Sequence, residues 1–141
     1  MKNFIQFGLL MLGFLASNAH AAPGEFWEMS STTEVAGTPF PTPPQIEKIC
    51  VANGVPDPQR LQSKDDNCKI TDIKNVNKNV SWQTRCVEKL ATMVGDGEIA
   101  YTRNSMIGKS TLSGQMGAEK VVMNIRYRGK RVGGTCDTDK D

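Results

Sequence analysis

Few residues of this chain could carry out catalysis, and they do not form a known motif. The only histidine, His20, lies in a segment that we expect to be removed, so the remaining chain lacks the commonest general base and metal ligand. Serine–lysine or carboxylate pairs would have to act instead. The nearest pairs are Ser105 with Lys109, Ser63 with Lys64, Asp65 with Asp66, and Asp96 with Glu98. None sits in a recognisable motif, so we expect no catalytic residue and no enzyme.

Two further patterns resemble cofactor or metal sites but are incomplete. Residues 108–111 (Gly-Lys-Ser-Thr) look like the end of a phosphate-binding loop, yet the required earlier glycine is replaced by Arg103. Asp137, Asp139 and Asp141 alternate as calcium ligands do, but no glycine or downstream glutamate completes a binding loop. We therefore expect no cofactor and no metal.

A cluster of basic residues is the strongest candidate for binding an anionic partner. It comprises Arg126, Arg128, Lys130 and Arg131, which we place at the tip of a hairpin that turns at Gly129-Lys130. We favour a solvated edge hairpin kept soluble by its positive charge, and if the cluster binds a partner, we expect an anionic envelope lipid. Without residues 1–21 the chain has 16 basic and 15 acidic residues, a net charge of +1, which argues against a nucleic-acid binder.

Aromatic residues provide a second candidate surface. Trp27, Trp82 and Tyr101 are expected to face the inside of the sheet, together with Tyr127. Alternation along 119–128 also points Val121, Met123 and Ile125 inward. In a small closed barrel the aromatic side chains would fill the core. In an open half-barrel they would line an apolar cleft and face a ligand.

The first 21 residues predict export. Lys2 precedes an apolar run from Phe4 to Ala16, and Ala19-His20-Ala21 matches a signal-peptidase site, with cleavage after Ala21. The run is too short to span a bilayer comfortably. We expect a signal peptide at 1–21 and a single soluble domain at 22–141 in the periplasm.

Four cysteines in a small exported chain predict two disulfides. They are Cys50, Cys68, Cys86 and Cys136, without zinc-site spacing. A hairpin centred on Asn77 would place Cys68 opposite Cys86, which favours Cys68–Cys86 with Cys50–Cys136. The pairing of Cys50 with Cys68 and of Cys86 with Cys136 stays open.

The composition favours strands, because residues 22–141 hold ten valines and seven isoleucines against three leucines. We expect eight strands: 25–35, 46–51, 68–74, 79–86, 98–102, 105–112, 119–128 and 131–136. A proline-rich loop at 39–44 separates the first two, and 87–94 is ambiguous because Val87, Leu90, Ala91 and Val94 fit helical spacing. Gly95, Gly97, Gly114, Gly117 and Gly129 are expected to mark turns. The predicted fold is an all-β antiparallel meander forming a curved sheet or small barrel, with all four cysteines near one end.

The chain resembles a bacterial family of exported proteins known as domain of unknown function 3617. The resemblance covers nearly all of residues 22–141. The matching residues are Gly24, Trp27 and Glu28; Pro39–Pro44 before Cys50; Asp66, Cys68, Lys69 and Asp72; Trp82 and Cys86; Gly95–Tyr101; and Gly129–Gly133 before Cys136. One residue is inserted in the Gly-x-Trp start, and Val51–Gly54 and the turn at Asn77 also differ from the family pattern. The resemblance implies compartment, cysteines and fold, but no reaction.

These observations predict a non-enzymatic periplasmic domain that binds an apolar or amphipathic envelope molecule against Trp27, Trp82 and Tyr101. The alternative is a protein-interaction module, an inhibitor or envelope assembly factor, that uses the basic hairpin or the proline-rich loop. The expected partner is therefore an envelope lipid or a periplasmic protein.

Overall fold

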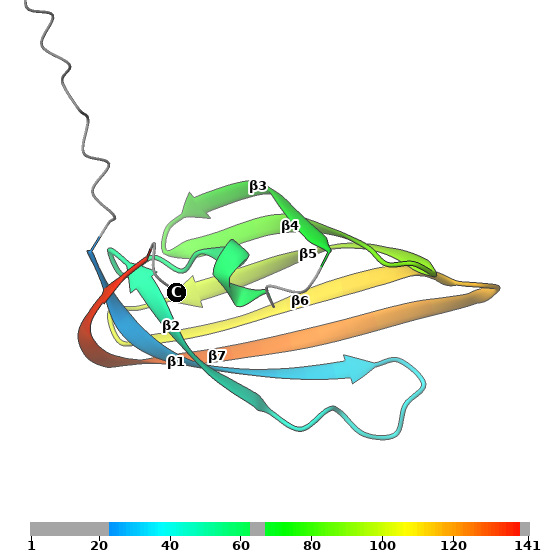
Figure 1. The fold of residues 1–141 in the computed structure, drawn as a ribbon, viewed down its shortest axis with the longest axis horizontal. Coiled ribbons are helices and arrows are strands. Elements are labelled where there is room, and N and C mark those ends of the chain that lie inside the picture. The colour runs from blue at the N-terminus through cyan, green and yellow to red at the C-terminus, as the bar shows by residue number, and fades with distance from the viewer. Residues whose placement is uncertain (1–22, 63–66, 139–141) are drawn as a thin grey trace, which may run out of the picture.

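The computed structural model describes residues 23–62 and 67–138, so the expected signal peptide lies outside the described residues. These residues form seven strands and one short 3₁₀ helix (Figure 1). The elements are β1 (Pro23–Val35), β2 (Gln45–Ala52), η1 (Pro58–Leu61), β3 (Cys68–Val76), β4 (Asn79–Val87), β5 (Ala91–Tyr101), β6 (Ser105–Met116) and β7 (Glu119–Asp137).

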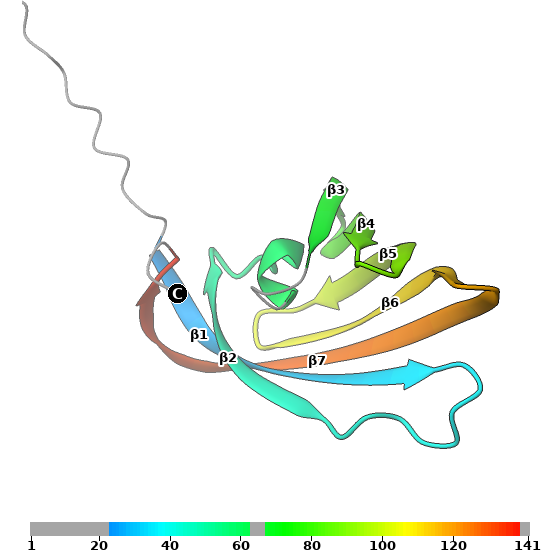
Figure 2. The same ribbon diagram turned by 45° about the vertical axis from the view of Figure 1, so that its right-hand side comes forward.

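The strands form one antiparallel sheet in the order β2-β1-β7-β6-β5-β4-β3. Strands β3 to β7 form an up-and-down meander. Its last strand, β7, also pairs with β1, and β1 pairs with β2 on its other side. Figure 2 shows the sheet curling into a trough, with η1 inside the curve. We call the face that carries η1 the inner face and the opposite face the outer face. The predicted curved, all-β fold is confirmed, and the sheet is open because β2 and β3 form its two edges.

The predicted hairpin turn at Gly129-Lys130 is wrong. Strand β7 runs without interruption through both residues, pairing with β1 on one side and β6 on the other, so there are seven strands rather than eight. Gly129 lies between methionines of these neighbours, and a Cβ there would come within 2.8 Å of Met106 Cγ. The glycine therefore allows close packing inside the strand instead of making a turn.

The same explanation applies to other glycines that were expected to end elements. Gly95 and Gly97 lie inside β5, and Gly114 lies inside β6. A Cβ at Gly97 would overlap the ring of Trp82. Only Gly117 of this group lies in a turn, with φ +64°. Residues 87–94, which fit helical spacing, form no helix and instead contain the end of β4 and the start of β5.

The β3–β4 hairpin places Cys68 opposite Cys86 by means of a β-bulge. Asn77 and Lys78 form the turn with φ 51° and 59°, the geometry of a type I′ turn. The register set by this turn shifts by one residue between Thr71 and Lys74, and Cys68 then pairs with Cys86. Without the bulge, Cys68 would face the neighbouring Val87. The favoured disulfide pairing is confirmed, with Cys68–Cys86 and Cys50–Cys136 both bonded.

The second disulfide joins strands that are not neighbours. Cys50 is on β2 and Cys136 on β7, and their Cα atoms are 5.9 Å apart although β1 lies between the strands. The bridge crosses β1 at Gly24, where a Cβ would lie 2.6 Å from Cys50 Sγ. A bulge in β7 at 132–134, containing two positive-φ glycines, brings Cys136 to this position.

The expectation that all four cysteines lie near one end is wrong. Cys68–Cys86 lies at the end of the sheet where β7 begins, and Cys50–Cys136 lies where β7 ends. Two features cause this. Strand β7 does not turn back at Gly129, and the β2–β3 connection starts at one end of the sheet and finishes at the other (Figure 1).

Candidate functional site

The inner face of the trough carries the apolar side chains, as strand alternation requires. Strand β4 shows this most clearly, because its residues alternate strictly between exposed and buried. A first cluster occupies the part of the trough near the end of β7. Its members are Trp27, Met29, Val51, Val80, Trp82, Ile99, Met106 and Tyr127. A second cluster near the start of β7 comprises Cys86, Met93 and Leu112.

The predicted ligand-facing aromatics lie mainly inside the first cluster. Trp27 is 1% exposed and Trp82 is 5% exposed, so in this conformation both act as core residues. Tyr101 is half-buried at the margin of the cluster, and its hydroxyl accepts a hydrogen bond from Asn75 Nδ2 at 2.9 Å. Trp27 Nε1 is buried without a hydrogen-bond acceptor among the described residues. A trough ligand would therefore meet other side chains first.

A small cavity lies under η1, between the two clusters. Its volume is about 80 Å³, and its lining includes Trp82, Leu112 and Ile125 together with the buried hydroxyl residues Thr84 and Ser110. The Asp57 carboxylate caps the helix by accepting a hydrogen bond from the Gln59 amide, and Pro58 and Leu61 pack the helix onto the cavity. The volume suits a few waters or the tip of an aliphatic chain, not a whole lipid.

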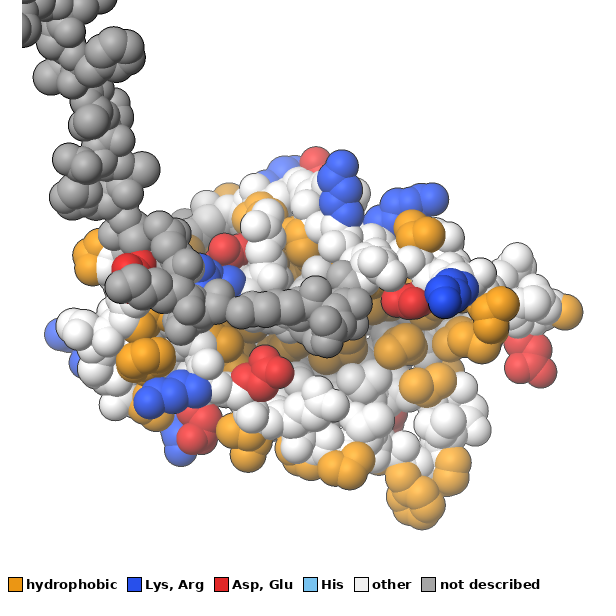
Figure 3. Space-filling view, viewed as in Figure 1, with side chains coloured by type: hydrophobic (Ala, Val, Ile, Leu, Met, Phe, Trp, Pro, Cys, Tyr) orange, Lys and Arg blue, Asp and Glu red, His pale blue; other side chains and the backbone are white. Residues whose placement is uncertain are grey.

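The more accessible apolar surface is a row on β7. Val121, Met123 and Ile125 are half-buried and pack against the second cluster. The register places Val35 of β1, also half-buried, beside Met123. Figure 3, which views the trough from its inner side, shows hydrophobic side chains gathered along the right half of this face. We call the side chains of Val121, Met123 and Ile125 the trough row.

The trough row was predicted to point inward but was not singled out as a site. The alternation along 119–128 identified its orientation, and this is confirmed. Its partial exposure depends on which elements cover the sheet, and that cannot be read from one strand. The sequence instead indicated the tryptophans as ligand-facing residues, because large aromatic side chains occur often in both cores and binding sites.

The basic cluster lies along a strand instead of at a hairpin tip, and its residues divide between two directions. Arg126, Arg128 and Lys130 alternate along the outer face, whereas Arg131 follows Lys130 directly. Three of the four form ion pairs with carboxylates of β1. The pairs are Arg126–Glu34 at 3.8 Å, Lys130–Glu28 at 3.1 Å and Arg131–Glu25 at 3.3 Å. Arg128 has no carboxylate within 4 Å among the described residues.

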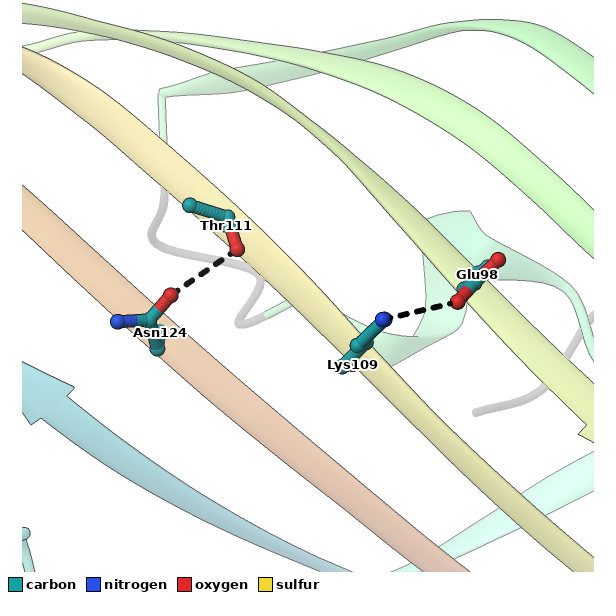
Figure 4. Close-up of polar contacts among 4 residues, drawn as sticks. All are labelled: Glu98, Lys109, Thr111 and Asn124. Atoms are coloured by element: carbon teal, nitrogen blue, oxygen red, sulfur yellow. Dashed lines mark hydrogen bonds and ion pairs between the residues drawn. The ribbon is translucent and has the colours of Figure 1, made fainter.

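Polar side chains of neighbouring strands form cross-strand pairs on the outer face (Figure 4). Lys109 of β6 lies 3.3 Å from Glu98 of β5, and Thr111 donates a hydrogen bond of 3.0 Å to Asn124 of β7. Each pair joins residues directly opposite in the register. Such exposed pairs contribute at most about 1 kcal/mol each, so they set local register more than global stability.

The described residues include two of the four pairs considered for catalysis, Ser105 with Lys109 and Asp96 with Glu98. Ser105 and Lys109 are four residues apart on one strand, about 13 Å, and Lys109 pairs with Glu98 instead. Residues 108–111 are extended inside β6, which excludes a phosphate-binding loop. Asp96 and Glu98 lie on the same face of β5, about 7 Å apart along the strand, and Glu98 forms an ion pair with Lys109. Ser63, Lys64, Asp65, Asp66, Asp139 and Asp141 lie outside the described residues.

Comparison with known proteins identifies the family but not a function. Within the described residues, no helix has the length and apolarity needed to cross a membrane. No curated protein and no solved structure matches the chain. The family model described as "Protein of unknown function (DUF3617)" matches residues 21–136, which include every described strand apart from Asp137, the last residue of β7. The chain therefore belongs to the DUF3617 family of proteins of unknown function.

Proposed function

We propose that this protein is an exported, non-enzymatic binding domain that holds an apolar or amphipathic envelope molecule in its trough. The observation that carries the proposal is the trough row: three neighbouring apolar side chains on the inner face of β7 that are only half-buried. Contiguous exposed apolar surface on a small domain commonly marks a site of interaction. The two disulfides support an oxidising compartment.

The arrangement of the trough favours a ligand with a narrow apolar portion. Ile125 contacts both the first and the second cluster, and it also lines the cavity of about 80 Å³ beneath η1. An aliphatic chain lying on Met123 and Ile125 would point its end toward this cavity. The cavity hydroxyls of Thr84 and Ser110 would tolerate a polar atom there.

A titration with a fluorescent fatty-acid analogue tests the proposal. Met123→Gln should weaken binding about tenfold, because it replaces part of the apolar contact with an amide. Val122→Gln is the matched control, since Val122 is also half-buried and adjacent but faces the outer side. Equal weakening by both variants, or no binding by the unaltered domain, would contradict the trough as the site.

A protein-interaction module is the second candidate, favoured by Phe40. This side chain is 80% exposed in the proline-rich loop, and the loop is tied back to β1 because the Thr42 amide donates a 2.7 Å hydrogen bond to the Thr33 carbonyl. A fixed loop that presents an exposed phenylalanine suits recognition by another protein. A pull-down from periplasm with the unaltered domain should recover a stoichiometric partner that the Phe40→Ser variant does not recover. Recovery of the same partner by the unaltered domain and by the variant would exclude this loop as the interaction site.

A further inference from the structure

The outer face contains a shallow dish that belongs to no function considered above. It has a volume of about 460 Å³ and lies across β5, β6 and β7, with Asn79 of β4 at one margin. Two adjacent rows of the sheet register form it. One row contains Ala100, Ile107 and Arg128, and the next contains Glu98, Lys109 and Arg126. We call this depression the outer dish.

The charges of the outer dish are unbalanced. Its lining holds Lys109, Arg126 and Arg128 against a single carboxylate, Glu98. Glu98 forms an ion pair with Lys109. Arg126 Nη2 lies 3.8 Å from Glu34 Oε2 of β1, which is a long distance for an ion pair. Arg128 has no such partner in the described part of the chain. One guanidinium group is therefore available, with a second two residues away on the same face.

The spacing of these two arginines suits a tetrahedral anion. Residues i and i+2 of a strand lie about 7 Å apart on one face, so both side chains can converge on one phosphate group. Guanidinium groups bind phosphate oxygens in paired, charge-assisted hydrogen bonds. The dish thus has the donors for a phosphate group.

The apolar part of the same surface argues for a phosphate group attached to a lipid. Ile107 is 60% exposed beside Arg128, and Ile46 of β2 is 66% exposed two strands further along the same row. Two exposed isoleucines flanking an unpaired arginine match the interface of an anionic bilayer, where phosphate groups border acyl chains. A free phosphate ion would leave both isoleucines in water.

We propose that the outer dish docks the protein on an anionic bilayer, with Arg128 and Arg126 on a phospholipid headgroup and Ile107 against its apolar border. The trough lies on the opposite face of the sheet. Binding of a ligand in the trough and binding of a headgroup at the outer dish are therefore independent, and either proposal can fail without the other.

Co-sedimentation with vesicles of phosphatidylcholine, with and without phosphatidylglycerol, tests this proposal. The domain should bind only the vesicles that contain phosphatidylglycerol. Arg128→Gln should lower the binding constant about fivefold, in keeping with about 1 kcal/mol for each basic residue at an anionic surface. Ile107→Ser should also lower it, without any change of charge.

Two matched variants of the outer face serve as controls. Arg85→Gln removes the same charge and Val94→Ser a similar exposed apolar side chain, at positions outside the outer dish. Both should bind as the unaltered domain does. The proposal is overturned if binding does not depend on phosphatidylglycerol, or if the control variants lose as much binding as Arg128→Gln and Ile107→Ser.

Discussion

Gly97 lies beneath the indole ring of Trp82, and this contact explains why glycine is needed inside a strand here. A Cβ at position 97 would overlap the ring and would also lie 2.9 Å from Ser110 Cβ. The ring fills the space that the missing side chain leaves on the inner face. Gly108 beneath Ile99 repeats the arrangement one strand further on. These glycines let large side chains lie flat against a strongly curved sheet.

Gly97→Ala should therefore destabilise the domain. Overpacking of a tight core typically costs about 1–3 kcal/mol, because the indole ring and its neighbours have to shift. Urea unfolding of the oxidised protein measures the free energy of unfolding. Asp96→Ala is the control, since the adjacent side chain points to the outer face and should change stability by less than about 0.5 kcal/mol. Equal stability of Gly97→Ala and the unaltered protein would show that Trp82 does not need this glycine.

At the scale of the elements, the β3–β4 hairpin combines a turn that requires two positive φ angles with a β-bulge. Lys78 has φ 59°, a conformation that costs most residues about 1–2 kcal/mol but costs glycine little. The bulge between Thr71 and Lys74 then restores the register that the disulfide needs. The turn and the bulge must therefore occur together for Cys68 to meet Cys86.

Lys78→Gly should stabilise the hairpin, since Asn-Gly is the preferred type I′ turn. We expect the free energy of unfolding to rise by about 0.5–1 kcal/mol, as the relief of left-handed strain exceeds the added flexibility of the unfolded chain. Thermal and urea unfolding of the oxidised protein provide the measurement. Lys69→Gly, inside β3, should have the opposite effect. A loss of stability in both variants would show that Lys78 makes contacts worth more than its strain.

Strand positions could be predicted from the sequence, but several element ends could not. Alternation located the strand containing Val80, Trp82, Thr84 and Cys86 and oriented the first half of β7. The turns expected at Gly95-Asp96-Gly97, Gly114 and Gly129 were wrong because glycine serves two purposes. It adopts turn conformations, and it admits a neighbouring side chain or backbone within a sheet. The second use depends on residues in other strands, such as Met106 for Gly129.

The candidate site was less predictable than the strands. The sequence indicated the inner aromatics and the basic cluster, but Trp27 became core once β2 and η1 covered that part of the trough. Three of the four basic residues, all except Arg128, became paired when β1 placed Glu25, Glu28 and Glu34 beside β7. These contacts follow from the β1–β7 pairing, which joins residues about a hundred positions apart.

At the scale of the whole molecule, the two disulfides differ in how much chain they close. Cys50–Cys136 spans 86 residues and ties β2 across β1 to β7, whereas Cys68–Cys86 spans 18 residues within one hairpin. Loop-closure entropy depends on that length. The long bridge therefore restricts the unfolded chain more, and it also holds the N-terminal strand pair against the meander.

Replacing both cysteines of one bridge by serine should show this difference. Loss of Cys50–Cys136 should cost about 4–5 kcal/mol and loss of Cys68–Cys86 about 3 kcal/mol, by the chain-entropy relation. Urea unfolding of the two double variants, each with its other bridge intact, gives both values. A larger loss from the short bridge would mean that folded-state packing around Cys68 and Cys86 outweighs loop closure.

The central claim is that the trough holds an apolar or amphipathic molecule, and a native mass spectrum tests it most directly. The protein would be purified without detergent from the cells that make it. We predict a ligand mass that stays bound under native conditions and is lost in organic solvent. The mass of the chain itself should be four hydrogens below that of its reduced form, because both disulfides are formed. Met123→Gln should retain less of that mass than Val122→Gln. A spectrum showing only the unliganded chain, from protein that also fails to bind the fatty-acid analogue, would contradict the account.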